Sequence, residues 1–410
     1  MISNSFALVG EYISMAWVSI ISHKMRSFLT TLGIFIGVTT IITIWTTIQG
    51  LNNYVNDTLS EIGSSVVYVE KFPWVITGDF FKYRNRKNVT WNEYEAIQRY
   101  STVADYVTPQ VVSQKTIGYR ENKFENIAVL GTTESFIETS SVLPSEGRFL
   151  TELDIRNRIS VCVLGAELAT RLFENTDPIG KRISIDGLKY RVIGVLERQG
   201  DFFGQSRDEY AVVPIGTFRN VFGPHRGMQI AVMTNNADAV DDMKEELRGI
   251  LRKERKVKPD EEDDFAINEQ TQLTSFYSST TSTLYAIIIV IAAVSLLVGG
   301  IGITNIMLVS VTERTKEIGL RKAVGAKRIN VLSQFLIESV AISSIGGTIG
   351  IAFGIIGGSI VLSFMQVDTG VSMSSIFVGF GFSALVGIIS GFYPAFKASN
   401  MNPIDSLRYE

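Results

Sequence analysis

Four long stretches without a charged side chain constrain this sequence more than any other feature. They cover residues 28–48, 270–312, 339–367 and 369–396. Each reaches the roughly 20 residues that a helix needs to cross about 30 Å of hydrocarbon. The segment between the first and second stretches, residues 63–270, has the mixed composition of soluble protein. The pattern predicts an α-helical membrane protein with four transmembrane helices and a large domain inserted between the first and second.

Basic residues near the stretches predict which side of the membrane each segment occupies. Lys24 and Arg26 precede the first stretch, and six basic residues lie within the connection 312–328, whereas the connection between the last two stretches carries only Asp368. Lys and Arg in short flanks stay on the cytoplasmic side. We therefore expect a multi-pass protein of the cell (inner) membrane, with both termini in the cytoplasm and the large domain outside it.

The domain boundaries follow from these stretches. No small-x-small cleavage pattern follows the first stretch, which favours an uncleaved helix over a signal peptide. Apolar residues at helical spacing over 5–21 favour an amphipathic helix over a flexible tail. The expected segments are a cytoplasmic amphipathic N-terminal helix (1–27), transmembrane helix 1 (28–48), an outer stalk (49–62), the extracytoplasmic domain (63–270), a second stalk segment (271–283), transmembrane helix 2 (284–311), a cytoplasmic connection with a short helix (312–328), transmembrane helices 3 (331–362) and 4 (374–396), and a cytoplasmic tail (397–410).

The second stretch is longer than a membrane requires. A continuous helix over 271–311 would measure roughly 60 Å, and its first third is polar. Apolar residues nevertheless follow one side of it, and a matching stripe follows the first stretch. We expect the two helices to pack together as a stalk, and a helix break near Thr280 is the alternative. The stripes are Leu51, Val55 and Leu59 in one helix and Leu273 and Tyr277 in the other.

The inserted domain alternates short strands and helices, which predicts an α+β fold with a subdomain of about residues 116–228 inserted into it. Thr90 and Glu93 form a capping-box pattern, and Asp186-Gly187 is a hairpin turn signal. The acidic run 259–264 predicts a surface loop open to a basic partner. Expected strands cover 64–70, 106–117, 126–130, 158–164, 182–185, 190–196, 229–233 and 265–268, and expected helices cover 90–100, 167–173 and 239–255.

Glycines recur at helical spacing in the last three transmembrane helices. A face of bare backbone lets another helix approach closely in a medium where the hydrophobic effect does not drive association. We favour tight helix packing over glycine that is merely tolerated. The residues are Gly346, Gly350, Gly354 and Gly358 in helix 3, Gly387 and Gly391 in helix 4, and Gly299, Gly300 and Gly302 in helix 2.

The cytoplasmic connection predicts a short amphipathic helix. Thr312 is a candidate N-cap, and Glu317 with Arg321 forms a favourable i,i+4 pair. Such a helix suits docking to a cytoplasmic partner, although a basic loop that only fixes topology is an equal alternative. Glu338, the only ionisable residue of helix 3, is expected to contact this basic connection or to serve ion conduction. The apolar side of the short helix is expected to comprise Ile318, Leu320 and Val324.

Enzymatic signatures are missing from the sequence. Its single cysteine and two histidines exclude an intrachain disulfide and argue against a dedicated zinc site. It contains no G-x-x-x-x-G-K-[ST] nucleotide-binding loop and no apparent nucleophile and base pair. We expect no catalytic residues, no metal site and no cofactor bound by this chain.

Four segments together resemble the MacB/FtsX-like permeases of ABC transporters. The most diagnostic is 299–328 (GGIGITNIMLVSVTERTKEIGLRKAVGAKR), and segments 23–38, 163–196 and 393–409 agree in the same order. The resemblance covers essentially the whole chain. It identifies residues 313–327 as the coupling helix that an ATPase subunit receives, with Glu313, Arg314, Glu317, Gly319, Arg321, Lys322, Gly325 and Ala326 as its candidate residues.

The resemblance also implies partners and a mechanism. It predicts a permease subunit, paired with a second copy or a paralogous permease, that relays ATP-driven motion from a separate cytoplasmic ATPase to the extracytoplasmic domain. ATP and Mg would then bind to the ATPase. A periplasmic adaptor, an outer-membrane channel and membrane lipid are further expected partners, and nucleic acid is not. The alternative is an FtsX-like signalling permease that activates an extracytoplasmic cell-wall hydrolase or sensor, and a membrane enzyme is the weakest third possibility.

Overall fold

The computed structural model describes residues 24–62, 65–76, 78, 80–174, 176–202, 205–223, 227–367 and 373–407. The expected N-terminal amphipathic helix lies outside these residues. The chain divides into two compact units. A helical unit comprises Met1–Tyr54 and Thr280–Glu410, and an α/β unit comprises Val55–Ser279.

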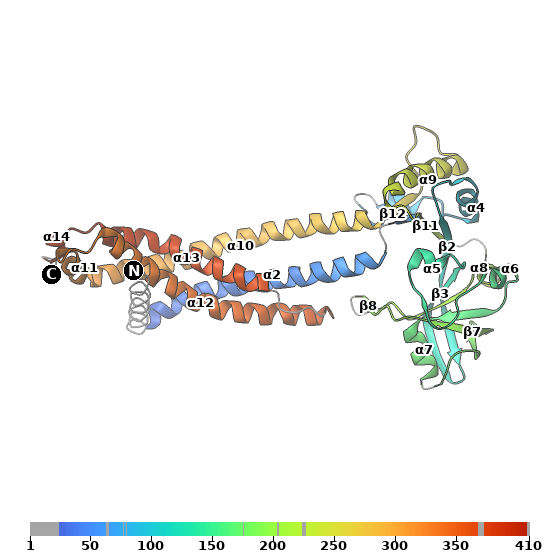
Figure 1. Cartoon of the computed structure of the whole chain (residues 1–410), viewed down its shortest axis with the longest axis horizontal. Coiled ribbons are helices and arrows are strands. Elements are labelled where there is room, and N and C mark those ends of the chain that lie inside the picture. Colours follow the sequence, from blue (N-terminus) through green and yellow to red (C-terminus); the bar gives the residue numbers. More distant parts are fainter. Residues whose placement is uncertain are drawn as a thin grey trace. The chain divides into compact units, whose positions relative to one another are not determined.

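Within the residues that the structure describes, four helices are long and apolar enough to cross a membrane, as predicted. They are α2 (Lys24–Ile62), α10 (Gln270–Glu313), α12 (Arg328–Phe364) and α13 (Met373–Ser399), and two short helices, α11 (Thr315–Ala323) and α14 (Pro403–Leu407), accompany them (Figure 1). The expectation of one continuous helix through Thr280 is confirmed, because α10 runs unbroken for 44 residues. The alternative of a break at that point is therefore wrong.

The glycine face of α12 packs on a ridge of side chains from α2. The ridge consists of residues four apart, so each one faces one glycine. A Cβ atom added at Gly350 would lie 2.8 Å from the Cβ of Val38, closer than real Cβ atoms approach. The hydroxyl of Thr39 also donates to the carbonyl of Gly350 at 3.3 Å. The facing residues are Ile34 at Gly346, Val38 at Gly350, Ile42 at Gly354 and Thr46 at Gly358.

A second face of α12 packs against α13 through small residues. A Cβ added at Gly391 would lie 2.5 Å from the Cβ of Ser339, and one added at Gly347 would lie 2.6 Å from the Cβ of Ser383. Each step of four residues forward on α12 corresponds to four backward on α13, which defines an antiparallel register. The facing pairs are Ser339 with Gly391, Ser343 with Gly387, Gly347 with Ser383 and Ile351 with Gly379.

Helix α10 also approaches its neighbours through glycine. Gly299 lies against Ile34 of α2, where an added Cβ would meet the Cγ1 atom at 3.2 Å. Gly300 lies against Ser390 of α13, where an added Cβ would meet the hydroxyl at 2.5 Å. Gly302 is half-buried. The backbone of α10 thus approaches α2 at Gly299 and α13 at Gly300.

One mixed sheet organises the α/β unit, in the order β12-β1-β11-β2-β3-β10-β5-β7-β4, with β6 paired to both β2 and β7. The pairs β10–β3 and β5–β7 are parallel and the others antiparallel. The strands are β1 (Val66–Glu70), β2 (Tyr106–Tyr119), β3 (Asn122–Thr132), β4 (Pro144–Gly147), β5 (Val161–Leu164), β6 (Arg182–Ile185), β7 (Leu188–Leu196), β10 (Tyr210–Pro214), β11 (Gln229–Met233) and β12 (Ala266–Glu269), and a separate pair is β8 (Asp201–Phe202) with β9 (Gln205–Ser206).

Strand β5 shows how the sheet separates two apolar cores. All four of its residues are buried. Because side chains alternate across a sheet, Cys162 and Leu164 enter the core beneath α4 (Trp91–Tyr100), α7 (Ala166–Phe173) and α9 (Val240–Arg255), and Val161 and Val163 enter the core on the other face. Burial raises the pKa of the Cys162 thiol.

The helices of the α/β unit are α3 (Phe80–Arg84), α4 (Trp91–Tyr100), α5 (Phe136–Ser140), α6 (Glu152–Arg156), α7 (Ala166–Phe173), α8 (Ile215–Phe222) and α9 (Val240–Arg255), with a 3₁₀ turn at Ala237–Ala239.

Each strand and helix expected in this unit overlaps an observed one. The capping box is confirmed, because the backbone N–H of Thr90 donates to Glu93 at 2.9 Å. The hairpin turn is also confirmed, since Asp186 and Gly187 both have positive φ, 51° and 86°. Strand β10 was not predicted, although it lies centrally between β3 and β5.

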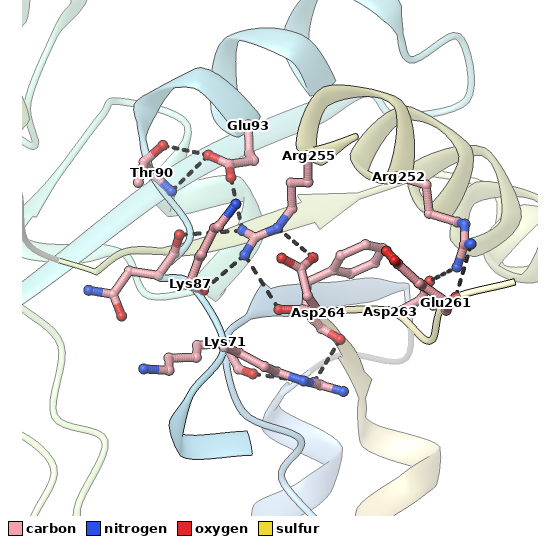
Figure 2. A network of polar contacts seen from close by, with 12 residues as sticks. Lys71, Lys87, Thr90, Glu93, Arg252, Arg255, Glu261, Asp263 and Asp264 are labelled. Carbon is pink, nitrogen blue, oxygen red and sulfur yellow. Dashed lines mark hydrogen bonds and ion pairs between the residues drawn. The ribbon is translucent and has the colours of Figure 1, made fainter. Parts of the chain in front are cut away.

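A buried arginine organises the polar end of the unit (Figure 2). Arg255, at the end of α9, has a side chain that is 3% exposed. Its guanidinium lies 2.9 Å from the Glu93 carboxylate and 2.7 Å from that of Asp264, and it donates to the Lys87 carbonyl at 2.9 Å. Asp263 pairs with Arg252 at 2.6 Å. Asp263 and Asp264 therefore contact arginines of their own chain, whereas Asp260, Glu261 and Glu262 are exposed, so contact of this loop with a basic partner stays a prediction.

Candidate functional site

The connection between α10 and α12 is the strongest candidate site, and its helix starts later than predicted. Thr312 lies inside α10, where its hydroxyl donates to the Val309 carbonyl at 2.7 Å. The N-cap of α11 is Arg314. The predicted Thr312 cap is wrong because the transmembrane helix continues through this residue. Glu313 is exposed at its end.

A glycine turn ends α11. Gly325 has a φ of +102°, a conformation that costs glycine little. The N–H of Ala326 donates to the Arg321 carbonyl at 3.0 Å, and that of Gly325 donates to the Lys322 carbonyl at 3.1 Å. These two bonds form a Schellman motif. The motif reverses the chain so that α12 begins at Arg328.

Polar side chains tie α11 to the first turns of α12. Arg314 lies 3.4 Å from the carboxylate of Glu338, whose side chain is 3% exposed. Arg321 donates to the Gln334 amide oxygen at 2.6 Å and pairs with Glu317 at 2.5 Å, which confirms the predicted i,i+4 pair. The expected contact of Glu338 with the basic connection is also confirmed. An unpaired carboxylate in an apolar bundle is costly, so this pair fixes the position of Arg314.

Two contacts tie α11 to the segment that follows α13. The ammonium group of Lys322 donates to the carbonyls of Ser399 at 2.8 Å and Met401 at 2.5 Å. Gly319 is buried against α14, where an added Cβ would lie 2.6 Å from the Cβ of Ser406. Burial, followed by the charge of Arg328, lowers the pKa of Lys322. A lysine that donates to carbonyls at a helix end suits their partial negative charge.

The apolar residues of α11 do not share one side, contrary to the prediction. Ile318 is 3% exposed, whereas Leu320 is 58% and Val324 is 82% exposed. Residues two apart are separated by about 200° around a helix, so Ile318 and Leu320 point in opposite directions. The exposed residues fall within one arc of about 120°, which we call the outer face of α11. It consists of Lys316, Glu317, Leu320, Ala323 and Val324.

Two family models match the chain and together cover both units. The model of the MacB-like periplasmic core domain matches residues 27–250, and that of the FtsX-like permease C-terminal domain matches residues 289–403. The chain belongs to the MacB/FtsX-like family of ABC transporter permeases. The family resemblance drawn from the sequence is therefore confirmed.

Curated relatives of this permease carry the name macrolide export ATP-binding/permease protein MacB. One from Bdellovibrio bacteriovorus is 35% identical over 98% of this chain and 62% of its own length. Another from Chlorobaculum tepidum is 36% identical over 97% of this chain and 61% of its own length. The permease thus spans about three fifths of the length of these relatives. Among solved structures, the periplasmic region of MacB from Actinobacillus actinomycetemcomitans is similar at 19% identity, with a TM-score of 0.46 over 55% of this chain and 98% of that one.

The structure places the predicted residues of the permease in different settings. Gly319 is buried, Arg314, Arg321, Lys322 and Ala326 are half-buried, and Glu313, Glu317 and Gly325 are exposed. In the expected stalk, Leu51, Val55, Leu273 and Tyr277 are half-buried, and the side chain of Leu59 lies outside the described residues. The packing of 49–62 against 271–283 stays a prediction. Sequence reasoning missed Gln334, Ser339, Ser343 and Ser390, which face predicted residues from other helices.

Proposed function

We propose that this chain is a permease subunit that transmits ATP-driven motion from a cytoplasmic ATPase, on a separate chain, to an extracytoplasmic α/β unit. Two copies, or one copy and a paralogue, would receive two ATPase subunits. ATP and Mg would bind to the ATPase. A periplasmic adaptor, an outer-membrane channel and lipid are the further partners of an export complex of this kind. The α/β unit lies outside the cytoplasm in this proposal, and both termini and α11 lie inside.

One observation carries the proposal: α11 is held on its inner side and apolar on its outer side. Arg314 and Arg321 bind α12, and Lys322 binds the carbonyl of Ser399 at the end of α13. Displacement of α11 would therefore displace two transmembrane helices. The outer face offers Leu320 and Val324 to solvent, between Lys316 and Glu317. An apolar centre with a charged rim is the composition of a protein contact.

The test measures coupled ATPase activity of the purified complex in nanodiscs. Leu320→Glu is expected to lower assembly and coupled activity about tenfold, because it places a charge at the centre of the contact. Charge reversal at Glu317 or Arg321 should act in the same direction. Leu153→Glu is the matched control, since Leu153 is a similarly exposed leucine of the α/β unit. Unchanged activity in all three α11 variants would show that α11 does not dock the ATPase.

A further inference from the structure

One face of the sheet in the α/β unit is only partly covered at its centre. Strand β2 lies between β11 and β3, yet Val112 near its middle is 54% exposed, whereas Val111, on the opposite face, is 3% exposed. Val112 pairs with Leu130 of β3. Two residues earlier in β3, and therefore on the same face, Ala128 pairs with Tyr210 of β10. These side chains form the floor of a cavity of about 410 Å³.

Aromatic and apolar side chains form one wall of this cavity. Phe136 of α5 and Val142, which follows α5, line it and belong to the apolar core on this face of the sheet. Tyr68 of β1 also lines it, and its ring packs against that of Trp74 with the centroids 5.1 Å apart. The wall is therefore built from side chains that are packed in place rather than from a free surface.

A buried carboxylate holds the opposite, polar wall in position. Asp208 is 2% exposed and accepts from the backbone N–H groups of Gln199 and Gly200, each at 2.9 Å. It thus fixes the backbone at the start of the segment that leads into β10. The uncharged polar side chains that line the cavity are Gln110, Ser140, Gln199 and Ser206.

The charged side chains at the cavity balance one another. Among the described lining residues, only Arg207 and Glu209 are charged, and their signs are opposite. Glu209 forms an ion pair with Arg171 of α7, and Arg207 has a partner as well. A charged ligand would meet no unpaired opposite charge in this lining, so it would lose its hydration without compensation. The lining therefore favours an uncharged ligand.

We propose that this cavity binds a small uncharged amphipathic molecule, whose apolar body lies on Val112, Leu130 and Phe136 and whose hydroxyl or amide groups face Gln110 and Gln199. Its volume falls within the roughly 300–1,000 Å³ of small-molecule sites, which combine an apolar lining with a few polar groups. The described lining residues all belong to the α/β unit. The inference is therefore independent of the docking role of α11.

Protection of an introduced thiol in the full chain tests this proposal. Cys162 is the only cysteine and is fully buried, so Val112→Cys supplies the reactive thiol. The purified chain in nanodiscs is labelled with a maleimide in the presence of octyl glucoside, below the concentration at which micelles form. Octyl sulfate and octyltrimethylammonium carry the same apolar chain on an anionic and a cationic head group.

Octyl glucoside should slow labelling at position 112 about fivefold once its concentration is about four times its Kd, because labelling follows the unoccupied fraction. The two charged analogues at the same concentration should slow it less than about twofold, since neither finds a counter-charge.

Two further variants make the result specific to the cavity. Leu188→Cys places a thiol at another exposed apolar position, 46% exposed at the start of β7, and its labelling should not respond to octyl glucoside. Ala128→Phe, combined with Val112→Cys, fills the floor of the cavity and should make labelling at position 112 insensitive to octyl glucoside. Continued resistance of Cys162 to labelling reports that each variant is folded.

Three results would overturn the proposal. The first is labelling at position 112 that octyl glucoside does not slow. The second is equal slowing by the three head groups, or equal slowing at positions 112 and 188, because either would reflect a general effect of the apolar chain. The third is a thiol at position 112 that is unreactive before any amphiphile is added, since another part of the chain or a second copy would then cover the cavity.

Discussion

The two units of this permease are stabilised by opposite means. In the helical unit, transmembrane helices meet where side chains are smallest, as between Gly350 and Val38 or Gly391 and Ser339. In the α/β unit, two apolar cores fill the space between sheet and helices, and a buried arginine joins segments that are far apart in sequence. The difference follows from the solvent. Apolar burial drives association in water, whereas in lipid only close packing and hydrogen bonds do so.

Of the substitutions that test this comparison, replacement of Arg255 should have the largest effect on stability. Arg255→Met leaves the carboxylates of Glu93 and Asp264 without their cation, and it should destabilise the α/β unit by about 3–5 kcal/mol. Hydrogen exchange of β12 and α9 amides in the full chain measures the loss. Lys258→Met removes an exposed cation from the adjoining loop and should change little. A small effect of the Arg255 variant would show that its charges are not what holds this end of the unit.

A methyl group between α12 and α13 should have the next largest effect. Gly391→Ala brings a Cβ to 2.5 Å from the Cβ of Ser339, so the helices must separate, at a cost of about 1–3 kcal/mol. Resistance of the purified chain to thermal unfolding in detergent reports this cost. Gly381→Ala is the matched control, because it lies on the same helix with open space around it. Equal thermal stability of the two variants would contradict the claim that close approach at Gly391 stabilises the helical unit.

The pH dependence of stability tests how much the ion pair of Arg148 and Asp154 stabilises the α/β unit. Burial alone would raise the pKa of the Asp154 carboxyl, but hydrogen bonds from Arg148 and Thr151 outweigh it and lower the pKa from 3.8 to about 2. The carboxylate therefore stabilises the folded unit above about pH 4, by about 2 kcal/mol, and this contribution is lost as the pH falls from about 4 to about 2.

The Asp154→Asn variant should unfold more readily at neutral pH and show a flatter dependence of stability on pH between about 2 and 4. Denaturant unfolding followed at several pH values measures the slope. Glu152→Gln, in the same helix but exposed, is the control and should keep the slope of the unmodified chain. An unchanged slope for the Asp154 variant would show that the Asp154 carboxylate is not the source of this pH dependence.

The turn after α11 should show the smallest effect. Gly325→Ala forces a side chain into a positive-φ conformation and should cost about 1 kcal/mol. Gly249→Ala, inside α9 and with open space around it, should instead be neutral or stabilising. Local hydrogen exchange at residues 321–328 and within α9 measures the stability change that each variant causes. Equal protection changes would mean that the Schellman turn does not define the end of α11.

The sequence predicted elements better than it predicted contacts. The four long helices and the glycine spacing of α12 follow from residue patterns along one chain segment. The partners Val38, Ser339 and Ser383 do not, because crossing points depend on the whole bundle. The role of Arg255 was missed for the same reason, since Glu93 lies 162 residues away. The error on Ile318 and Leu320 was different, because helical periodicity alone places them on opposite sides.

The ridge-and-glycine contact between α2 and α12 has a consequence for biogenesis. Thr39 and Gly350 are 311 residues apart. At a synthesis rate of 5–20 residues per second, α2 is complete about 15–60 s before its partner emerges from the ribosome. During that interval, Val38 and Ile42 face lipid or another protein rather than the glycine backbone of α12. Helix α2 is thus synthesised long before its glycine-faced neighbour α12.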